Sequence, residues 1–184
     1  MNLWFRLIWA KFAWRFRSKT SLDGVGSRNF RVWPTDLDIF LHMNNGKFFT
    51  LMDTARYDHF KRSGTWQKLV KLGWYPVVVS ETITFRKSLQ PWQVFAIETK
   101  IIGWDDMGYY IEQRFVVGHE VYTKAIVRVR FLKKTRGILT PLEVNEAMGG
   151  WVGIVPVVPA WILEWNTHTT LPKGREPAPS DWSI

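Results

Sequence analysis

The stretch from Arg28 to Arg62 decides the fold: RNFRVWPTDLDIFLHMNNGKFFTLMDTARYDHFKR. It opens with a short strand-like run, RNFRVW, that ends at Pro34. A polar turn with two acids, TDLDIFLHMNN, comes next. From about Gly46 onward the apolar residues have helical spacing. The stretch therefore predicts one strand, one turn and one long helix.

The predicted helix has a single apolar face. Its members recur at i, i+3, i+4, i+7 and i+11, a spacing that places side chains on one side of a helix: Phe48, Leu51, Met52, Ala55 and His59. Asn44 or Asn45 suits the N-cap, and Gly64 suits the end of the helix. A second, shorter helix, TWQKLVKLG, is expected to end at Gly73.

Beyond Pro76 the pattern changes to the alternation of β-strands. Four strands are expected: VVVSETITFRKSL, VFAIETKIIGW, MGYYIEQRFVVG and EVYTKAIVRVRFLKK. The last one alternates regularly, which predicts an antiparallel sheet with one buried and one wetter face. A helix of about 17 residues laid across such a sheet buries both apolar faces, so the predicted class is α+β. Short helices are expected after Pro141 and from Pro159, followed by an extended tail.

The composition is that of a globular protein: the chain has 184 residues, 46% hydrophobic and 22% charged. This length suits one domain with appendages. We predict a basic, tryptophan-rich segment at 1–22, a folded domain at 23–140, and a helical extension with a tail at 141–184.

The net charge of +9 is concentrated at the N-terminus. The first twenty residues, MNLWFRLIWAKFAWRFRSKT, have no acid and hold five of the nine charges: Arg6, Lys11, Arg15, Arg17 and Lys19. Charges interrupt the apolar run, so it does not suit a spanning helix, and it lacks the layout of a secretory signal. We expect residues 1–20 to lie on an anionic membrane surface. The alternative is a helix packed on its own domain or on a neighbouring subunit.

Composition also excludes several kinds of site. The chain has no cysteine, so a thiol nucleophile and a Cys-ligated metal are excluded. The four histidines are scattered without ligand spacing, which predicts no metal site. The basic residues of the body form no stripe with interleaved aromatic residues, which argues against nucleic-acid binding. The polar region Asp36–Arg56 is left as the candidate site.

Two interpretations of that region are open from the residues alone. In the first, an acid just ahead of the helix attacks a carbonyl, or activates water against it, while the N–H groups of the helix N-terminus polarise that carbonyl. In the second, Asp36 and Asp38 bond their own turn, Asn44 or Asn45 caps the helix, and His42 is a packed side chain.

The same residues resemble the signature of hotdog-fold acyl-CoA thioesterases of the 4-hydroxybenzoyl-CoA thioesterase-like group. The matching elements are Asp36-Leu-Asp38, His42-Met-Asn44-Asn45, Phe48 and Asp53-Thr-Ala-Arg56. Together with the run IIGWDDMGYYIEQRFV at 101–116, they are similar to the branch called thioesterase superfamily member six-like. The resemblance covers about residues 28–135. It implies a hotdog fold, in which a curved antiparallel sheet wraps a long helix.

The resemblance also implies roles for individual residues. Asp38 aligns with the carboxylate that acts as nucleophile or general base on the thioester carbonyl. Asn45 aligns with the position whose backbone N–H polarises that carbonyl. His42 and Asn44 match the element that shapes the turn and contacts substrate.

Three further positions bear on the resemblance. Asp53 and Arg56 match helix positions that we expect to be structural. Asp53 is shorter than the glutamate usual there, which argues against a carboxylate reaching the substrate from the helix. Leu41 stands where the group has glycine, which is expected to narrow the pocket or change the turn.

The resemblance implies a homodimer or a dimer of dimers whose sheets join edge to edge. The acyl group would enter between subunits, and surface cations would meet the phosphates of CoA. Candidates for these cations are Arg86, Lys87, Lys133, Lys134 and Arg136. CoA is part of the substrate, so no separate cofactor is expected.

We therefore expect a hotdog domain that hydrolyses a fatty or aromatic acyl-CoA to the acid and CoA, in the cytoplasm and peripheral on a membrane. The first alternative is a non-catalytic acyl-CoA or lipid-binding hotdog domain at a membrane surface. A hotdog dehydratase or hydratase ranks below it, and nucleic-acid binding ranks last.

Overall fold

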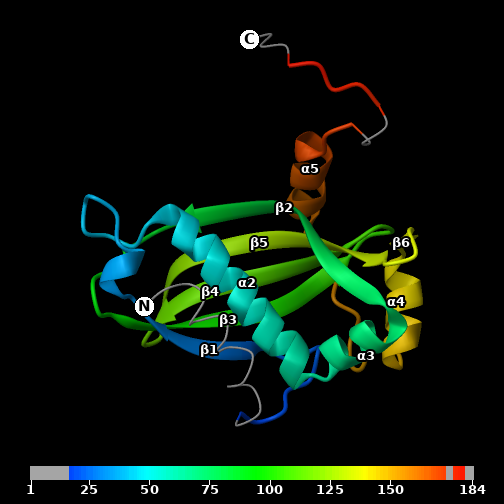
Figure 1. The fold of residues 1–184 in the computed structure, drawn as a ribbon, viewed down its shortest axis with the longest axis horizontal. Helices are drawn as coiled ribbons and strands as arrows, with labels where there is room; N and C mark the ends of the chain where they lie inside the picture. The colour runs from blue at the N-terminus through cyan, green and yellow to red at the C-terminus, as the bar shows by residue number, and fades with distance from the viewer. Residues whose placement is uncertain (1–16, 173–175, 181–184) are drawn as a thin grey trace.

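The chain folds around one curved antiparallel sheet and one long helix, as the sequence predicts (Figure 1). The computed structural model describes residues 17–172 and 176–180. Most of the predicted membrane-surface segment, residues 1–16, lies outside the described residues. No helix among the described residues combines the length and apolar character needed to cross a membrane.

Six strands form the sheet within the described residues, and every pair is antiparallel. They are β1 (Gly26–Arg31), β2 (Trp74–Phe85), β3 (Val94–Trp104), β4 (Tyr109–Val117), β5 (Glu120–Lys133) and β6 (Ile138–Leu139). Their order is β1-β3-β4-β5-β2, with β6 paired to the end of β5. The four strands expected from the alternating segments are confirmed, and β1 and β2 are the two edges.

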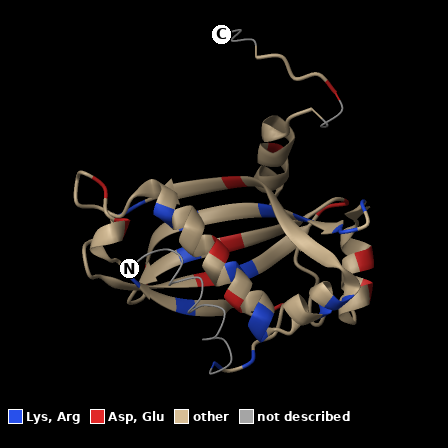
Figure 2. Cartoon of the chain, viewed as in Figure 1, with Lys and Arg blue, Asp and Glu red and all other residues tan. Residues whose placement is uncertain are grey.

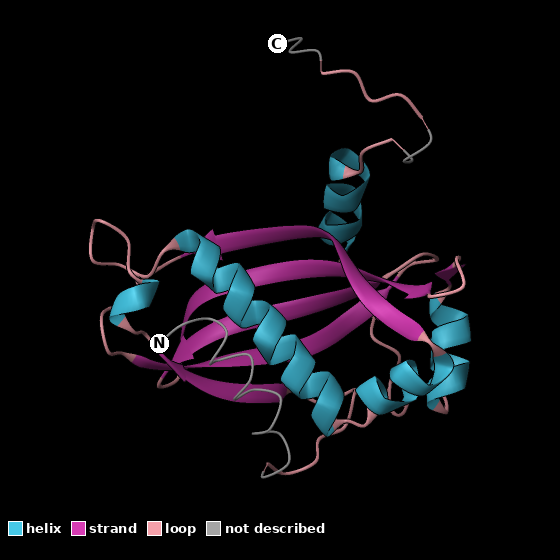
Figure 3. Cartoon of the chain, in the orientation of Figure 1, coloured by secondary structure: helices cyan, strands magenta, loops and turns pink. Residues whose placement is uncertain are grey.

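Helix α2 (Asn45–Arg62) crosses the face around which the sheet curls, and α3 (Thr65–Leu72) follows it (Figure 3). The predicted apolar face of α2 is confirmed, because all five of its members are buried: Phe48, Leu51, Met52, Ala55 and His59. Burying one large apolar side chain stabilises a fold by about 1.5–3 kcal/mol, so this face holds the helix on the sheet.

The two short C-terminal helices are also confirmed. Helix α4 (Pro141–Met148) begins with a capping box in which Thr140 and Glu143 bond each other's backbone N–H. Helix α5 (Ala160–Thr169) stands away from the body in Figure 1 and contacts the opposite face of the sheet from α2, through Ile162.

That opposite face differs from the prediction of a wetter surface. Ile126 and Arg128 of β5 are buried there, although they alternate with the core-facing residues. Ile126 packs with Tyr110, Val158 and Ile162 in a small second cluster. The cover over Ile126 comes from Val158 and Ile162, which follow α4 far along the chain, so the alternation of β5 alone could not reveal it.

Candidate active site

Asp36 and Asp38 have different environments although one residue separates them. Asp36 is buried at the end of a short 3-10 helix, Pro34–Asp36, and its Oδ2 accepts the Trp33 N–H at 3.0 Å. Its carbonyl accepts the Asn44 N–H at 2.8 Å, which ties the turn to the start of α2. Asp36 therefore shapes the turn.

Asp38 holds its turn with one carboxylate oxygen and leaves the other open. Oδ1 accepts the N–H groups of Phe40 at 2.9 Å and His42 at 3.3 Å. The Asp38 N–H donates to the His42 carbonyl at 2.9 Å, which closes the loop. No described residue donates a hydrogen bond to Oδ2. The carboxylate is thus oriented by its own turn while one oxygen can attack a carbon or accept a proton.

Leu41 has a backbone conformation that glycine adopts more easily than leucine. Its φ is 59°, in the left-handed region where a side chain costs roughly 1–2 kcal/mol. Its N–H donates to the Asp38 carbonyl at 3.1 Å, so the strained residue closes the turn that carries Asp38. The leucine therefore adds backbone strain to this turn, and it is not among the residues that line the pocket beside Asp38.

The two asparagines at the start of α2 do different things. The Asn44 side chain accepts the Gly46 N–H at 2.9 Å, which makes Asn44 the N-cap. Asn45 is the first helical residue, and its backbone N–H has no acceptor among the described residues. Such an N–H at the positive end of a helix suits a developing negative charge on oxygen.

A surface pocket of about 230 Å³ brings most of the predicted site together. It lies between the Asp38 turn, the first turn of α2 and the end of β2. Five of the seven predicted site residues line it: Asp38, His42, Asn45, Arg86 and Lys87. Its remaining lining residues are Met43, Phe48, Phe85, Ser88 and Leu89.

Sequence reasoning missed the contribution of Phe85 and Ser88 to this pocket. Both flank Arg86 and Lys87 where β2 ends. The available signal was that the predicted strand ends near these residues, because side chains that follow the end of an edge strand are not covered by a neighbouring strand. Phe85 also contacts Phe48 of α2, with ring centroids 4.9 Å apart, and so gives the pocket an aromatic wall.

Arg86 and Lys87 are held by an acid that the sequence did not suggest. Glu120, the first residue of β5, accepts from Arg86 at 2.7 Å and from Lys87 at 2.8 Å. Hydrogen bonds from Lys87 and Arg86 lower the pKa of Glu120. The pair keeps one net positive charge beside the pocket, because one carboxylate faces two cations.

Lys133 lies far from the pocket. In the antiparallel register of β2 and β5, Lys133 pairs with Trp74 whereas Phe85 pairs with Thr123. β2 has 12 residues, so at about 3.3 Å per residue its two ends lie roughly 36 Å apart along the strand. Lys133 instead contacts Glu143 of α4 at 3.3 Å. The structure therefore separates it from Arg86 and Lys87.

Arg56 is the centre of a buried polar network that joins α2 to the sheet, and exposed Asp53 pairs with it from the surface. Arg56 is 5% exposed; it bonds Gln113 of β4 at 2.6 Å, lies 3.1 Å from Glu81 of β2, and also pairs with Asp53. Gln113 in turn donates to the Met52 carbonyl at 3.1 Å. Burial raises the pKa of Glu81, although the Arg56 charge opposes this. These contacts fit the structural role expected for Asp53 and Arg56.

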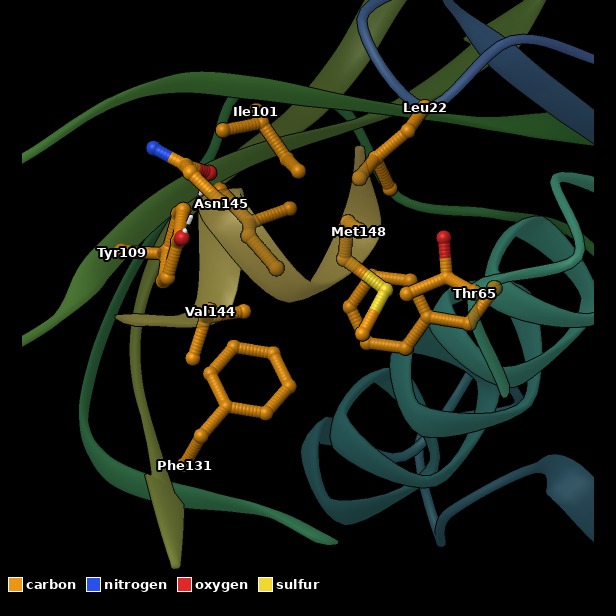
Figure 4. Close-up of a pocket in the computed structure, with 10 residues that line it drawn as sticks. Leu22, Thr65, Ile101, Tyr109, Phe131, Val144, Asn145 and Met148 are labelled. Carbon is orange, nitrogen blue, oxygen red and sulfur yellow. Dashed lines mark hydrogen bonds between the residues drawn. The ribbon is translucent and has the colours of Figure 1, made fainter. Parts of the chain in front are cut away.

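A second cavity lies inside the other end of the molecule (Figure 4). Its walls are mostly apolar and include Phe131, Val144 and Met148. Figure 4 shows the hydrogen bond that the Tyr109 hydroxyl donates to the Asn145 side chain at 2.7 Å, between two residues that line the cavity. Its volume of about 10 Å³ is close to the minimum for a single water. It is too small for a substrate. The Asp38 pocket is the candidate site because it brings together five of the predicted site residues.

The chemistry at the Asp38 pocket is that of a carboxylate, a helix N-terminus and a pair of cations. Among the residues that the structure describes, no group of three or more His, Asp or Glu side chains could hold a metal ion. The arrangement suits attack on a polarised carbonyl by Asp38 or by a water that it activates.

The comparisons with known proteins agree with this fold. The profile of the thioesterase-like superfamily matches residues 32–165, which is more than half of the chain. The chain therefore belongs to the thioesterase-like superfamily.

Among its relatives, the protein THEM6 of Xenopus laevis is 41% identical over 99 residues. The match covers 54% of this chain and 48% of that protein, so the chain spans about half the length of this curated relative.

Solved structures show the same architecture. The YbaW probable thioesterase of Escherichia coli has a TM-score of 0.63 at 20% identity, covering 66% of this chain and 95% of that one. A hypothetical protein of Staphylococcus aureus, solved in complex with CoA, has a TM-score of 0.60 at 13% identity, covering 79% and 96%. These neighbours establish the hotdog fold that the sequence predicts.

Proposed function

We propose that this chain hydrolyses an acyl-CoA thioester to the free acid and CoA. The observation that carries the proposal is the pocket in which the Asp38 carboxylate, the Asn45 N–H and the cations Arg86 and Lys87 meet. Membership of the thioesterase-like superfamily and the CoA complex of the Staphylococcus aureus neighbour support it.

Asp38 is the proposed nucleophile or general base. Its open Oδ2 would attack the thioester carbonyl or take a proton from an attacking water. The Asn45 N–H would donate to the carbonyl oxygen as negative charge develops there. His42 donates its backbone N–H to Asp38 and lines the pocket, so it would orient the acid and contact the substrate. Asn44, as the N-cap, would hold the helix start in place.

The walls of the pocket suit the two parts of an acyl-CoA. Met43, Phe48 and Phe85 offer apolar surface to an acyl group. Arg86 and Lys87 would meet the phosphates of CoA, whose charge competes with that of Glu120. Lys133 is too distant to join them on the same subunit.

We further propose a homodimer formed through the exposed edge of β2. An unpaired edge strand presents free N–H and C=O groups that can pair with a second copy. Val78 and Val79 of this edge are exposed apolar side chains, as a subunit contact would require. Because the Asp38 pocket adjoins the end of β2, a partner across this edge would lie close to it.

Residues 1–20 are the proposed membrane contact, which would make the protein peripheral on the cytoplasmic face of a membrane. Their five cations and their Trp and Phe side chains are the features that support it. Deletion of residues 1–20 is expected to reduce co-sedimentation with anionic vesicles, and unchanged co-sedimentation would contradict this contact.

Free-thiol release from acyl-CoAs of several chain lengths tests the hydrolysis. Asp38→Asn keeps an acceptor at Oδ1 but cannot attack or take a proton, so kcat/KM should fall at least about 100-fold. Asp106→Asn removes an equally negative, exposed side chain outside the pocket and should retain the wild-type rate. Slow release that Asp38→Asn leaves unchanged would reject hydrolysis in favour of acyl-CoA or lipid binding without catalysis.

A further inference from the structure

The segment between α4 and α5 is an apolar arm on the surface. From Gly149 to Leu163 the sequence, GGWVGIVPVVPAWIL, has no charged residue. Figure 2 shows the same segment without blue or red between the two helices. Ile154 is 95% exposed and Val157 is 88% exposed, and Val152 and Val155 beside them are exposed as well, so several aliphatic side chains are exposed together. We refer to residues 149–163 as the apolar arm.

The apolar arm is fixed in place, so its outward side chains are displayed by the fold. Val158 and Ile162 are buried against Tyr110 and Ile126 on the sheet. Gly103 of β3 makes room for this contact, because a Cβ there would lie 2.5 Å from the Val158 side chain. While these residues anchor the arm, Ile154 and Val157 lie in solvent.

Trp151 strengthens the start of the apolar arm. Its indole N–H donates to the Ile154 carbonyl at 3.2 Å, and its ring meets that of Trp104 with centroids 5.1 Å apart. Further along, Trp161 is half exposed and has Lys124 over its ring at 6.0 Å. Half-exposed tryptophans beside aliphatic side chains are typical of the boundary between headgroups and acyl chains.

The chain that follows the basic N-terminal residues reaches the same part of the molecule. Arg17 is tied to Asp58 and to the Ser27 carbonyl, each at 2.5 Å. From there the chain runs to 20–23, which lines a surface pocket together with 150–152 of the apolar arm. Residues 1–16 hold three of the cations and no acid. They directly precede Arg17, and residues 20–23 line the same pocket as the start of the apolar arm.

We propose that the apolar arm docks on the surface of an anionic lipid bilayer, with Ile154 and Val157 among the upper acyl chains. A bilayer fits because it accepts flexible apolar side chains without a complementary groove, while anionic headgroups attract the neighbouring cations. Exposed Lys68 lines the pocket that the apolar arm shares with residues 20–23, and exposed Lys19 directly precedes that lining. Asp23 is the acid in the same lining, so the excess of positive charge comes from Lys19 and the residues before it. This adds a second contact to the one proposed for residues 1–20, and it is independent of hydrolysis.

A single fluorescent label tests the docking, because the chain has no native cysteine to compete for it. The full chain carrying Ile154→Cys is labelled with an environment-sensitive dye and mixed with phosphatidylcholine vesicles with or without phosphatidylserine. The emission should shift to the blue with the anionic vesicles. The matched control, Val94→Cys, places the dye on an exposed valine at the start of β3, the opposite end of that strand from Gly103, and should not shift.

Vesicle partition supplies the second measurement. The double variant Ile154→Ser, Val157→Ser should lower the partition coefficient of the full chain about tenfold, because two apolar side chains no longer enter the bilayer and no charge is added. Val94→Ser should leave it unchanged. Thiol release in the absence of vesicles should be the same in all three proteins, which separates this result from a failure of the proposed hydrolysis.

Three outcomes would overturn the docking. The first is an unchanged label at residue 154 with anionic vesicles. The second is an equal shift at residue 94. The third is a shift at residue 154 that depends on protein concentration without vesicles, since a second copy of the chain would then cover the apolar arm.

Discussion

Two carboxylates in polar turns, Asp38 and Asp105, have opposite surroundings. Asp105 receives hydrogen bonds from the Tyr110 hydroxyl and from Arg128, both at 2.7 Å, and from two backbone N–H groups of its turn. Asp38 receives two backbone N–H groups on one oxygen and none from a side chain. Because both carboxylate oxygens of Asp105 accept hydrogen bonds, Asp105 is a structural acid. The carboxylate of Asp38 has one oxygen without such a bond, and this oxygen can react.

The placement of cations sharpens the comparison. Arg128 is buried, points at Asp105 and also lies over the Tyr110 ring at 5.7 Å. At the Asp38 pocket the cations Arg86 and Lys87 point at Glu120 instead. A cation bound directly to Asp38 would stabilise its negative charge and weaken it as a nucleophile or base, so its absence among the described residues favours reactivity.

The largest expected effect is on stability, from Asp105→Ala. Removing this acid leaves the buried Arg128 guanidinium without its partner, which should cost about 2–3 kcal/mol of the free energy of unfolding. Denaturant unfolding measures it, and Asp106→Ala, in the same turn but exposed, should cost less than about 0.5 kcal/mol. Equal losses in both variants would contradict the structural role of Asp105.

The decrease in the free energy of unfolding at acid pH should also depend on Asp105. Burial raises its pKa, but hydrogen bonds from Met107, Tyr110 and Arg128 outweigh this, so its pKa lies below the ordinary value. A lowered pKa in the folded state contributes stability that is present above the unfolded pKa and is lost as pH falls through the folded pKa. Unfolding measured from pH 5 to pH 2 should therefore be less pH-dependent in Asp105→Asn than in the wild type. An identical dependence would contradict this.

Much of this fold could be predicted because its signals are local and repeated. The spacing of Phe48, Leu51 and Met52 predicts α2, and the alternation of β5 predicts an antiparallel sheet. The turn that carries Asp38 came from a motif, and its pocket contains five of the seven residues predicted for it.

The unpredicted features all depend on contacts between distant parts of the chain. Lys133 was grouped with Arg86 because both are basic, but the register of β2 and β5 places them at opposite ends. Glu120 pairs with Arg86 across 34 residues for the same reason. Arg128 is buried because the turn of Asp105 bonds it, which alternation within β5 cannot show.

A smaller effect is expected on substrate binding, from Glu120→Gln. Neutralising Glu120 releases Arg86 and Lys87 toward CoA phosphates, so KM for an acyl-CoA should fall about two- to threefold at low salt. Initial rates at low and high salt measure it, and the difference should shrink as salt rises. Glu146→Gln removes the same charge from α4, at the other end of the molecule, and should not change KM. An equal fall in both variants would mean that only net charge matters.

The smallest expected effect is on stability, from Asp38→Asn. Asparagine keeps the Oδ1 acceptor for Phe40 and His42, and Oδ2 has no partner to lose among the described residues. The free energy of unfolding should therefore change by less than about 0.5 kcal/mol, in contrast to the loss for Asp105→Ala.

The same denaturant series measures this, with Leu41→Gly as a companion that relieves the left-handed strain of the turn. If Asp38→Asn destabilised the protein by more than about 1 kcal/mol and Leu41→Gly restored it, Asp38 would be a structural acid like Asp105. Its loss of thiol release would then no longer identify it as the reacting group. A stable but inactive Asp38→Asn separates the two carboxylates by function as well as by surroundings.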